Sequence, residues 1–303
     1  MIYTVTLNPA LDYVISLEGA LTPGSINRTD TEAIVLGGKG INVSTILHNL
    51  GEDTKALGFV AGFTGDALES GLAAKGISSD FIHLEQGMTR INVKVKADRE
   101  TEINGKGPEI PEEARAQLFE KLEKLTSADV LVLSGSIPKS MPSDIYEQIL
   151  AHIRENQVMT VVDTTGEMLM KILKYHPFLI KPNHIELGEL FGVTLKSEEE
   201  IIAYAGRLQQ LGARNVLVSM AGDGAILVDE NGGHCRQAPC SGTVRNSVGA
   251  GDSMVAGFLS GYLRTGDYRY ALQLGTAAGG ATAFSVGIAE QADIMKLLKQ
   301  IQN

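Results

Sequence analysis

The chain has 303 residues, of which 44% are hydrophobic, enough to form the buried core of one large α/β domain or two smaller ones. Its 26 basic and 36 acidic side chains give a net charge of −10, which argues against nucleic acid or an anionic membrane as the main partner. Two cysteines are too few for a zinc site or a disulfide framework, and no apolar run approaches the ~20 residues that span a bilayer. With no signal-peptide pattern at its start, the chain is expected to be cytoplasmic, with reduced thiols.

Predicted strands and helices alternate along most of the chain. In chain order the core elements are a strand at 2–7, a helix at 41–50, a strand at 54–60, helices at 64–75 and 111–126, a strand at 129–134, a helix at 142–155, a strand at 158–163, a helix at 166–174, a strand at 177–181, a helix at 197–211 and a strand at 214–219. Two β-like runs at 224–229 and 234–238 follow, and helices at 250–265, 267–285 and 290–301 close the chain. This alternation predicts an α/β fold with a doubly wound, mostly parallel sheet and helices on both faces.

Four other strands alternate polar and apolar residues, unlike the all-apolar core strands. They lie near 12–17 and 32–36 and in a hairpin at 91–97 and 100–104. We expect residues 11–36 and 89–105 to form a small antiparallel β lid, and residues 1–10, 37–88 and 106–303 to form the core with a nucleotide site. Such a lid would cover the carboxyl ends of the core strands, where open α/β sheets bind ligands.

The helix predicted at 250–265 begins at a glycine-rich turn. Val255 and Phe258 lie on its apolar face, and Gly249 and Gly251 leave its first amide groups uncrowded. A helix start of this kind attracts anions. Asp252 lies beside it, and two interpretations stay open: the carboxylate takes a proton from a hydroxyl that attacks a bound phosphate, or it only caps the helix.

A second glycine-rich run, Gly37-Gly-Lys-Gly-Ile-Asn42, opens the helix at 41–50. It is not a P-loop, because Lys39 is followed by glycine, and not a dinucleotide fingerprint, because Val43 replaces the third glycine. Glycines alone could serve a tight turn. A lysine and an asparagine among them favour a polyanionic or polyhydroxyl ligand.

Three charged residues near the predicted lid are candidate ligands of a sugar phosphate. Asp12 follows the first strand and could accept hydrogen bonds from two sugar hydroxyls, or form an Asx-turn. Arg28 and Arg90 could each hold a phosphate with the planar guanidinium, or be solvated surface charges.

Several residues toward the C-terminus could contact a nucleotide. Asn183 and Glu186 have the spacing of a helix cap, and could equally orient water around a phosphate-bound Mg²⁺. The turn from Ser219 to Gly224 could pack against a nucleotide or be a plain tight turn. Gly280 belongs to a helix rich in small residues, which allows close helix packing or leaves room for an adenine edge.

Taken together, the motifs Gly37-Gly-Lys-Gly and Gly249-Ala-Gly-Asp252 resemble the paired signatures of the ribokinase-like sugar kinases, the PfkB family, over essentially the whole chain. Segments 6–12, 37–43, 89–94 and 102–110 are most similar to the branch of the family that phosphorylates fructose 1-phosphate. Kinases of tagatose 6-phosphate share the first two segments and are the alternative. A non-catalytic sugar-phosphate sensor of the same fold is a third reading, which the intact Gly-Ala-Gly-Asp disfavours.

The resemblance implies phosphoryl transfer from ATP-Mg²⁺ to the 6-hydroxyl of the sugar phosphate. It implies that Asp252 is the general base and that the amides of Gly249, Ala250 and Gly251 form an anion hole. It also implies that the sugar hydroxyls are bound by Asp12, Gly38 and Asn42. The substrate's own phosphate would be held by Lys39, Arg28 and Arg90. Lys181, Asn183, Glu186, Ser219 and Gly224, with Gly280, would line the region of ATP and Mg²⁺, the metal having no direct protein ligand. The lid would exclude water and pair between subunits in a homodimer. Ala289 replaces an arginine found in some relatives, which leaves a monovalent-cation site open.

Overall fold

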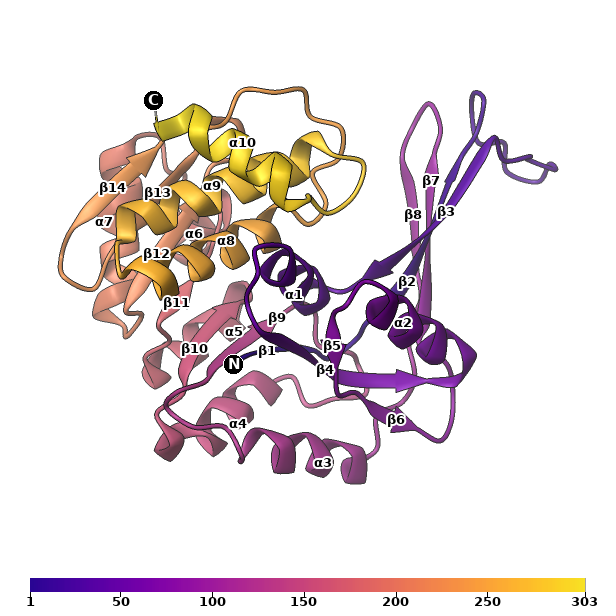
Figure 1. The fold of residues 1–303 in the computed structure, drawn as a ribbon, viewed down its shortest axis with the longest axis horizontal. Coiled ribbons are helices and arrows are strands. Elements are labelled where there is room, and N and C mark those ends of the chain that lie inside the picture. The colour runs from indigo at the N-terminus through magenta and orange to yellow at the C-terminus, as the bar shows by residue number, and fades with distance from the viewer. Residues whose placement is uncertain (303) are drawn as a thin grey trace.

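A ten-stranded sheet forms the centre of the molecule in the computed structural model, which describes residues 1–302 (Figure 1). The strand order is β14-β13-β12-β11-β10-β9-β1-β4-β5, with β6 paired to β4. The strands are β1 (Ile2–Thr6), β4 (Thr54–Ala61), β5 (Ser78–Ser79), β6 (Ile82–Leu84), β9 (Val130–Ser134), β10 (Met159–Asp163), β11 (Leu179–Ile180), β12 (Asn215–Ser219), β13 (Ala225–Val228) and β14 (His234–Gln237). All pairs are parallel except β12–β13 and β13–β14, which confirms the mostly parallel sheet.

Helices cover both faces of this sheet. One face carries α3 (Glu112–Leu122), α4 (Ile145–His152), α5 (Gly166–Ile172), α6 (His184–Leu190) and α7 (Glu198–Gln210); the other carries α1 (Lys39–Asn49), α2 (Gly62–Ala74), α8 (Ala250–Thr265), α9 (Tyr268–Phe284) and α10 (Gln291–Gln302). Short 3-10 turns lie at η1 (Arg154–Asn156), η2 (Leu173–Tyr175) and η3 (Ala221–Asp223). In β9, Leu131 and Leu133 pack on the first layer, and Val130 and Val132 on the second. Strands buried on both faces explain the continuous apolar runs in the sequence.

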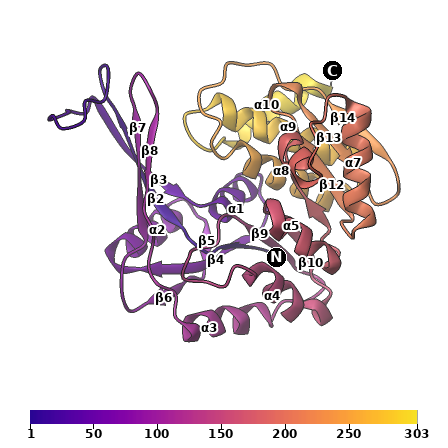
Figure 2. The same ribbon diagram turned by 180° about the vertical axis from the view of Figure 1, so that it is seen from behind.

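A separate four-stranded sheet projects from the body as a lid (Figures 1 and 2). Its order is β3-β2-β7-β8, with β2 (Ala10–Ser16), β3 (Thr31–Gly37), β7 (Arg90–Lys96) and β8 (Thr101–Asn104). The expected lid strands are present, but the sheet is not purely antiparallel, because its central pair β2–β7 is parallel. Both strands start at the core and run outward, and β3 and β8 return.

A few elements differ from the sequence expectations. The strand expected at 177–181 is limited to Leu179–Ile180, since Pro177 and Pro182 on either side cannot donate a ladder hydrogen bond. The helix expected at 142–155 is shorter, and its last turn is a 3-10 turn. Strands β5 and β6 were not expected, because two or three residues are too few to show a period.

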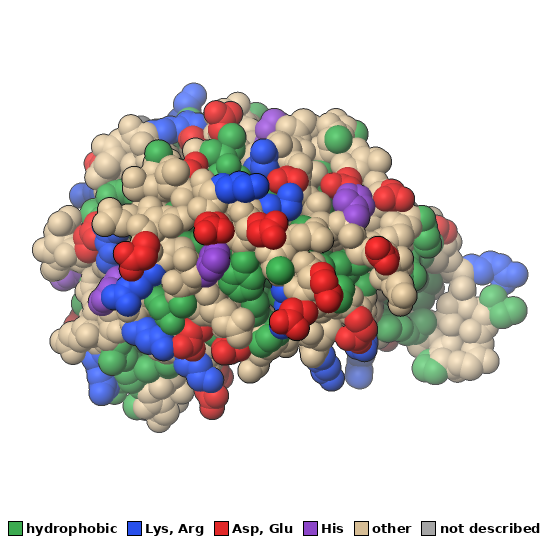
Figure 3. Space-filling view, turned by 90° about the horizontal axis from the view of Figure 1, so that it is seen from below, with side chains coloured by type: hydrophobic (Ala, Val, Ile, Leu, Met, Phe, Trp, Pro, Cys, Tyr) green, Lys and Arg blue, Asp and Glu red, His purple; other side chains and the backbone are tan. Residues whose placement is uncertain are grey.

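The outer surface mixes charges of both signs. The face seen from below intersperses acidic and basic side chains, and the lid extends from one end of the body (Figure 3). Across residues 1–302, no helix combines the length and the apolar character that a membrane span requires. Both cysteines, Cys235 and Cys240, are free thiols.

Candidate active site

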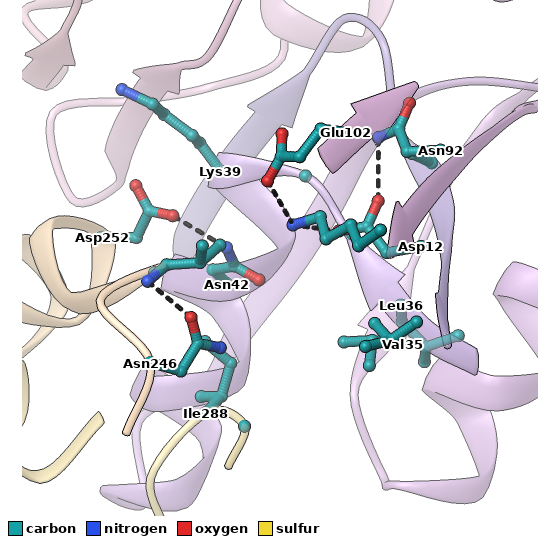
Figure 4. Close-up of a pocket in the computed structure, with 18 of the residues that line it drawn as sticks. Asp12, Val35, Leu36, Lys39, Asn42, Asn92, Glu102, Asn246, Asp252 and Ile288 are labelled. Carbon is teal, nitrogen blue, oxygen red and sulfur yellow. Dashed lines mark hydrogen bonds and ion pairs between the residues drawn. The ribbon is translucent and has the colours of Figure 1, made fainter. Parts of the chain in front are cut away.

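A cavity of about 560 Å³ lies between the inner face of the lid and the core (Figure 4). This volume is within the range of small-molecule sites. Of the residues singled out in the sequence, Asp12, Gly38, Lys39, Asn42, Arg90, Lys181, Gly249, Gly251 and Asp252 line it. The fold therefore brings together the two glycine-rich motifs and the first charged residue of the lid.

The start of helix α8 faces this cavity. Gly249 is its N-cap, with a φ of 81° in the left-handed region, and a Cβ there would lie 2.7 Å from Ile288 Cδ1. Glycine is therefore favoured at this position. The amide of Ala250 donates to the carbonyl oxygen of Ser247, 3.2 Å away, and Ala250 does not line the cavity. Three amides were expected to bind an anion. Those of Gly249 and Gly251 belong to residues that line the cavity.

Asp252 is a buried carboxylate on the first turn of α8. It accepts a hydrogen bond of 2.8 Å from Asn42 Nδ2 (Figure 4), and no side chain caps the helix, so the capping interpretation does not describe this structure. Burial raises the pKa of the Asp252 carboxyl to about 6, and the nearby charge of Asp163 acts in the same direction. A carboxylate with this pKa is suited to accept a proton near neutral pH.

Two lysines share one buried carboxylate next to Asp252. Asp163 Oδ2 lies 3.0 Å from Lys39 Nζ, and its Oδ1 lies 3.6 Å from Lys181 Nζ. Although burial opposes ionisation of Asp163, the charges of the two lysines hold its pKa below the usual value. A Cβ on Gly251 would lie 3.2 Å from Lys181 Nζ, so the missing side chain leaves room for this ammonium at the helix start.

Sequence reasoning missed Asp163. A signal was available: it is the last residue of β10, and a carboxylate at the carboxyl end of a parallel strand lies where such sheets bind ligands.

The lid contributes the other wall of the cavity. Asp12 lies within β2, so it forms no Asx-turn; its Oδ1 accepts from Asn92 Nδ2 at 2.8 Å and its Oδ2 lies 3.0 Å from Lys94 Nζ. Arg90 Nε donates to the carbonyl oxygen of Asn8 at 3.1 Å, and burial lowers the pKa of its guanidinium.

Sequence reasoning also missed Asn92 and Lys94. They follow Arg90 at two-residue intervals on a strand of strict alternation, so they share its face, and this period was the signal that could have identified them.

Apart from Lys181, the candidate nucleotide residues lie outside this cavity. Asn183 and Glu186 form a reciprocal capping box at the start of α6: Asn183 Oδ1 accepts from the amides of residues 185 and 186, and Glu186 Oε2 accepts from the amide of Asn183. Ser219 is bridged to Asn183 across the carboxyl ends of β11 and β12. The capping interpretation is therefore observed, and the second oxygen of Glu186 is not part of it.

Three more candidates also lie away from the cavity. Gly224 ends a 3-10 turn with a φ of 90°, and a Cβ there would lie 2.1 Å from the carbonyl oxygen of Gln237. Gly280 packs against Cys240, whose Cβ would be 3.1 Å from an added Cβ. Arg28 is exposed on the loop between β2 and β3. The structure thus does not bring Arg28 to the cavity, because this loop lies at the outer end of the lid.

A Mg²⁺ site formed by protein ligands alone is not evident in the part of the chain that the structure describes, where no group of three His, Cys, Asp or Glu residues could hold a metal. The side chains present instead fit an anion. Lys39, Lys181 and the start of α8 converge on one wall of the cavity, and glycines leave that wall open.

Comparison with known proteins gives matches along nearly the whole chain. The model of the pfkB family carbohydrate kinases matches residues 5–295. The 1-phosphofructokinase of Bacillus subtilis is 44% identical over 302 residues, and the D-tagatose-1-phosphate kinase of Bacillus licheniformis is 37% identical over 303; each alignment covers 100% of this chain and 99% of the relative. The crystal structure of phosphofructokinase-2 from Escherichia coli in complex with substrates and products is 27% identical, with a TM-score of 0.93 and coverage of 100% and 99%.

Proposed function

We propose that this chain, which belongs to the pfkB family of carbohydrate kinases and is an ATP-dependent phosphotransferase, converts fructose 1-phosphate to fructose 1,6-bisphosphate. The observation that carries the proposal is a buried carboxylate, Asp252, in one cavity with two lysines, a helix start and the sugar-binding candidate Asp12. Relatives named 1-phosphofructokinase, at 44% and 41% identity, support fructose 1-phosphate as the acceptor.

In the proposed reaction Asp252 takes the proton of the sugar 6-hydroxyl. The hydroxyl oxygen then forms a bond to the γ-phosphorus of ATP, while the bond from that phosphorus to the β–γ bridging oxygen breaks and ADP leaves. Phosphoryl transfer depends mainly on positioning and on stabilising the charge of the phosphoryl oxygens. The amides of Gly249 and Gly251 are fixed at the helix start, so they need no reorganisation to do this.

The positions of the lysines support a division of the two phosphate groups between different walls of the cavity. Lys39 was expected to hold the substrate's own phosphate, but it lies with Asp163 and Lys181 beside Asp252. We therefore assign Lys39 and Lys181 to the transferred phosphoryl group. Arg90, on the lid, is left to hold the phosphate at the opposite end of the sugar, since positions 1 and 6 are the two ends of the fructose chain.

The phosphates of ATP would occupy the core side of the cavity with the metal, and the rest of the nucleotide would extend beyond it. Mg²⁺ would arrive on the phosphates of ATP, where it neutralises part of their charge, and Asn183 and Glu186 would contact it through water. Within the capping box, Glu186 keeps one carboxylate oxygen for such a contact. Ser219 and Gly224, at the ends of neighbouring elements, would lie along the nucleotide.

The outer face of the lid supports a homodimer. The register of the lid strands places Ile34, Tyr13, Val93 and Ile103 in one row across all four strands, on the face opposite the cavity. Ile34 is 66% exposed and Ile103 is 63% exposed. We propose that this apolar row, Ile34–Tyr13–Val93–Ile103, packs against the lid of a second copy, because a sheet face of this kind gains free energy when it is covered.

A substrate comparison tests the proposal. Fructose 1-phosphate, D-tagatose 1-phosphate, tagatose 6-phosphate and fructose 6-phosphate would each be offered with ATP and Mg²⁺ while ADP formation is followed. We expect the highest kcat/KM with fructose 1-phosphate. D-tagatose 1-phosphate is the second candidate because relatives carry that name, and a higher kcat/KM with it would replace the proposed substrate. Binding of a sugar phosphate without ADP formation would indicate the non-catalytic sensor.

A further inference from the structure

The carboxylate of Asp12 is fixed by two side chains of the neighbouring strand. The parallel register pairs Asp12 with Asn92 and Val14 with Lys94, so Asn92 and Lys94 point to the same side of β7. Asn92 Nδ2 donates to Oδ1 of Asp12 at 2.8 Å (Figure 4), and Lys94 Nζ lies 3.0 Å from Oδ2. Each carboxylate oxygen of Asp12 therefore has its own partner.

Lys94 is withdrawn from solvent. Its side chain is 13% exposed and that of Asp12 is 12% exposed, whereas most lysines extend into water. Glu102 of β8, the next residue in the same cross-strand row, lies 3.9 Å from Lys94 Nζ on the other side. On the opposite flank of Asp12, a Cβ on Gly37 would lie 3.0 Å from Oδ1, so the missing side chain leaves room for the carboxylate.

We propose that Lys94 is a positioning residue for sugar binding, which holds the Asp12 carboxylate in the orientation that accepts two neighbouring hydroxyls of the sugar. This inference rests on the proposed function, in which Asp12 binds sugar hydroxyls. A carboxylate has about four lone-pair sites, so the bonds from Asn92 and Lys94 leave two for the sugar. Without Lys94 the carboxylate could rotate toward water and lose that arrangement.

The proposal predicts a separation of kinetic parameters. Lys94→Met should raise the KM for the sugar phosphate about 10- to 100-fold, the range for losing a hydrogen bond to a charged group. The KM for ATP should stay within about threefold, because Lys94 is on the lid and not at the start of α8. Lys94→Arg should restore part of the sugar affinity, since a guanidinium also donates to a carboxylate.

A matched control is available on α3. Lys121 Nζ forms an ion pair with Asp80 Oδ1 at 2.7 Å outside the cavity, so Lys121→Met removes a lysine–aspartate pair without touching the site. It should leave both KM values unchanged. Thermal unfolding of each variant shows whether it is folded. If Lys94→Met does not fold, Lys94→Gln and Lys94→Arg provide the same comparison.

A double-mutant cycle with Asp12→Asn decides whether Lys94 acts through Asp12. We expect Asp12→Asn to raise the KM for the sugar phosphate, and Lys94→Met to add little in the Asp12→Asn background. Full additivity would overturn the positioning role, because Lys94 would then contact the substrate itself. An unchanged KM in Lys94→Met, with a raised KM in Asp12→Asn, would overturn the inference and leave the proposed function intact. An unchanged KM in Asp12→Asn would instead overturn the proposed role of Asp12.

Discussion

Replacing Asp252 by asparagine separates catalysis from stability. The substitution removes the negative charge and the proton-accepting oxygen but keeps the size of the side chain. Its amide oxygen can still accept the hydrogen bond that Asn42 Nδ2 donates over 2.8 Å in the wild type. The cavity should therefore keep its shape, and a change in rate would report the lost base.

Asp252→Asn should lower kcat and raise the unfolding temperature. Loss of a general base lowers kcat by ~10²–10⁴. Burial raises the Asp252 pKa from 3.8 to about 6, so the folded state disfavours the ionised form. The resulting contribution to stability is fully present below pH ~4 and is lost as the pH rises through about 6. A shift of roughly two units corresponds to about 3 kcal/mol at pH 8. Asparagine carries no charge, so Asp252→Asn should unfold at a higher temperature than the wild type at pH 8.

Two measurements test this prediction. Turnover with fructose 1-phosphate and ATP gives kcat, and thermal unfolding at pH 8 and at pH 4 gives the stability difference, which should shrink at pH 4. Asp66→Asn on α2, at an exposed position, is a control that should change neither quantity. Near-normal turnover of Asp252→Asn would remove Asp252 from the chemistry. A lower unfolding temperature at pH 8 would mean that the carboxylate stabilises the fold through its neighbouring lysines.

Four further outcomes are expected. Wild-type kcat/KM should fall as the pH drops through about 6, because Asp252 must be ionised to accept a proton. Asp163→Asn should move this acidic limb of the pH profile to lower pH, because it removes a nearby negative charge. An acidic limb that stays in place would contradict the electrostatic effect of Asp163 on Asp252. Gly249→Ala should lower the free energy of unfolding by ~1–2 kcal/mol in denaturant titration, since its φ of 81° disfavours a Cβ. Arg90→Ala should chiefly raise the KM for the sugar phosphate, and equal use of unphosphorylated sugar would rule out a phosphate pocket there. Ile34→Asp should convert a dimer to a monomer in analytical ultracentrifugation, and an unchanged mass would exclude the lid face as the interface.

Most of the core could be predicted because its signals are local. Continuous apolar runs marked the parallel strands, and the spacing of Val255 and Phe258 marked the apolar face of α8. The glycine-rich helix starts were also visible, since positive φ values and close packing select glycine at positions such as Gly249. Alternation identified the lid strands. Their pairing could not be read in the same way, because the parallel β2–β7 contact depends on where both strands leave the core.

Contacts within the site depend on residues far apart in the chain, which explains what sequence reasoning missed. Asn42 and Asp252 are 210 positions apart, and Lys39 and Asp163 are 124 positions apart. No periodicity links such pairs, and only the rule for carboxyl ends of parallel strands pointed toward Asp163. Arg28 was expected to hold the substrate's phosphate, but its loop lies at the outer end of the lid, away from the cavity of its own chain.

The charges around Asp252 are balanced in a way that suits movement of a proton together with a phosphoryl group. Lys39 and Lys181 share Asp163, which leaves one net positive charge, and Asp252 supplies the matching negative charge. Burying such groups is costly unless each is paired. In the proposed reaction Asp252 would lose its negative charge on taking the proton of the sugar hydroxyl, and the transferred phosphoryl oxygens would bring a negative charge to the two lysines and the start of α8. The counter-charge of the lysines would thus pass from the carboxylate to the phosphoryl group, with no change in the net charge of the cavity during the step.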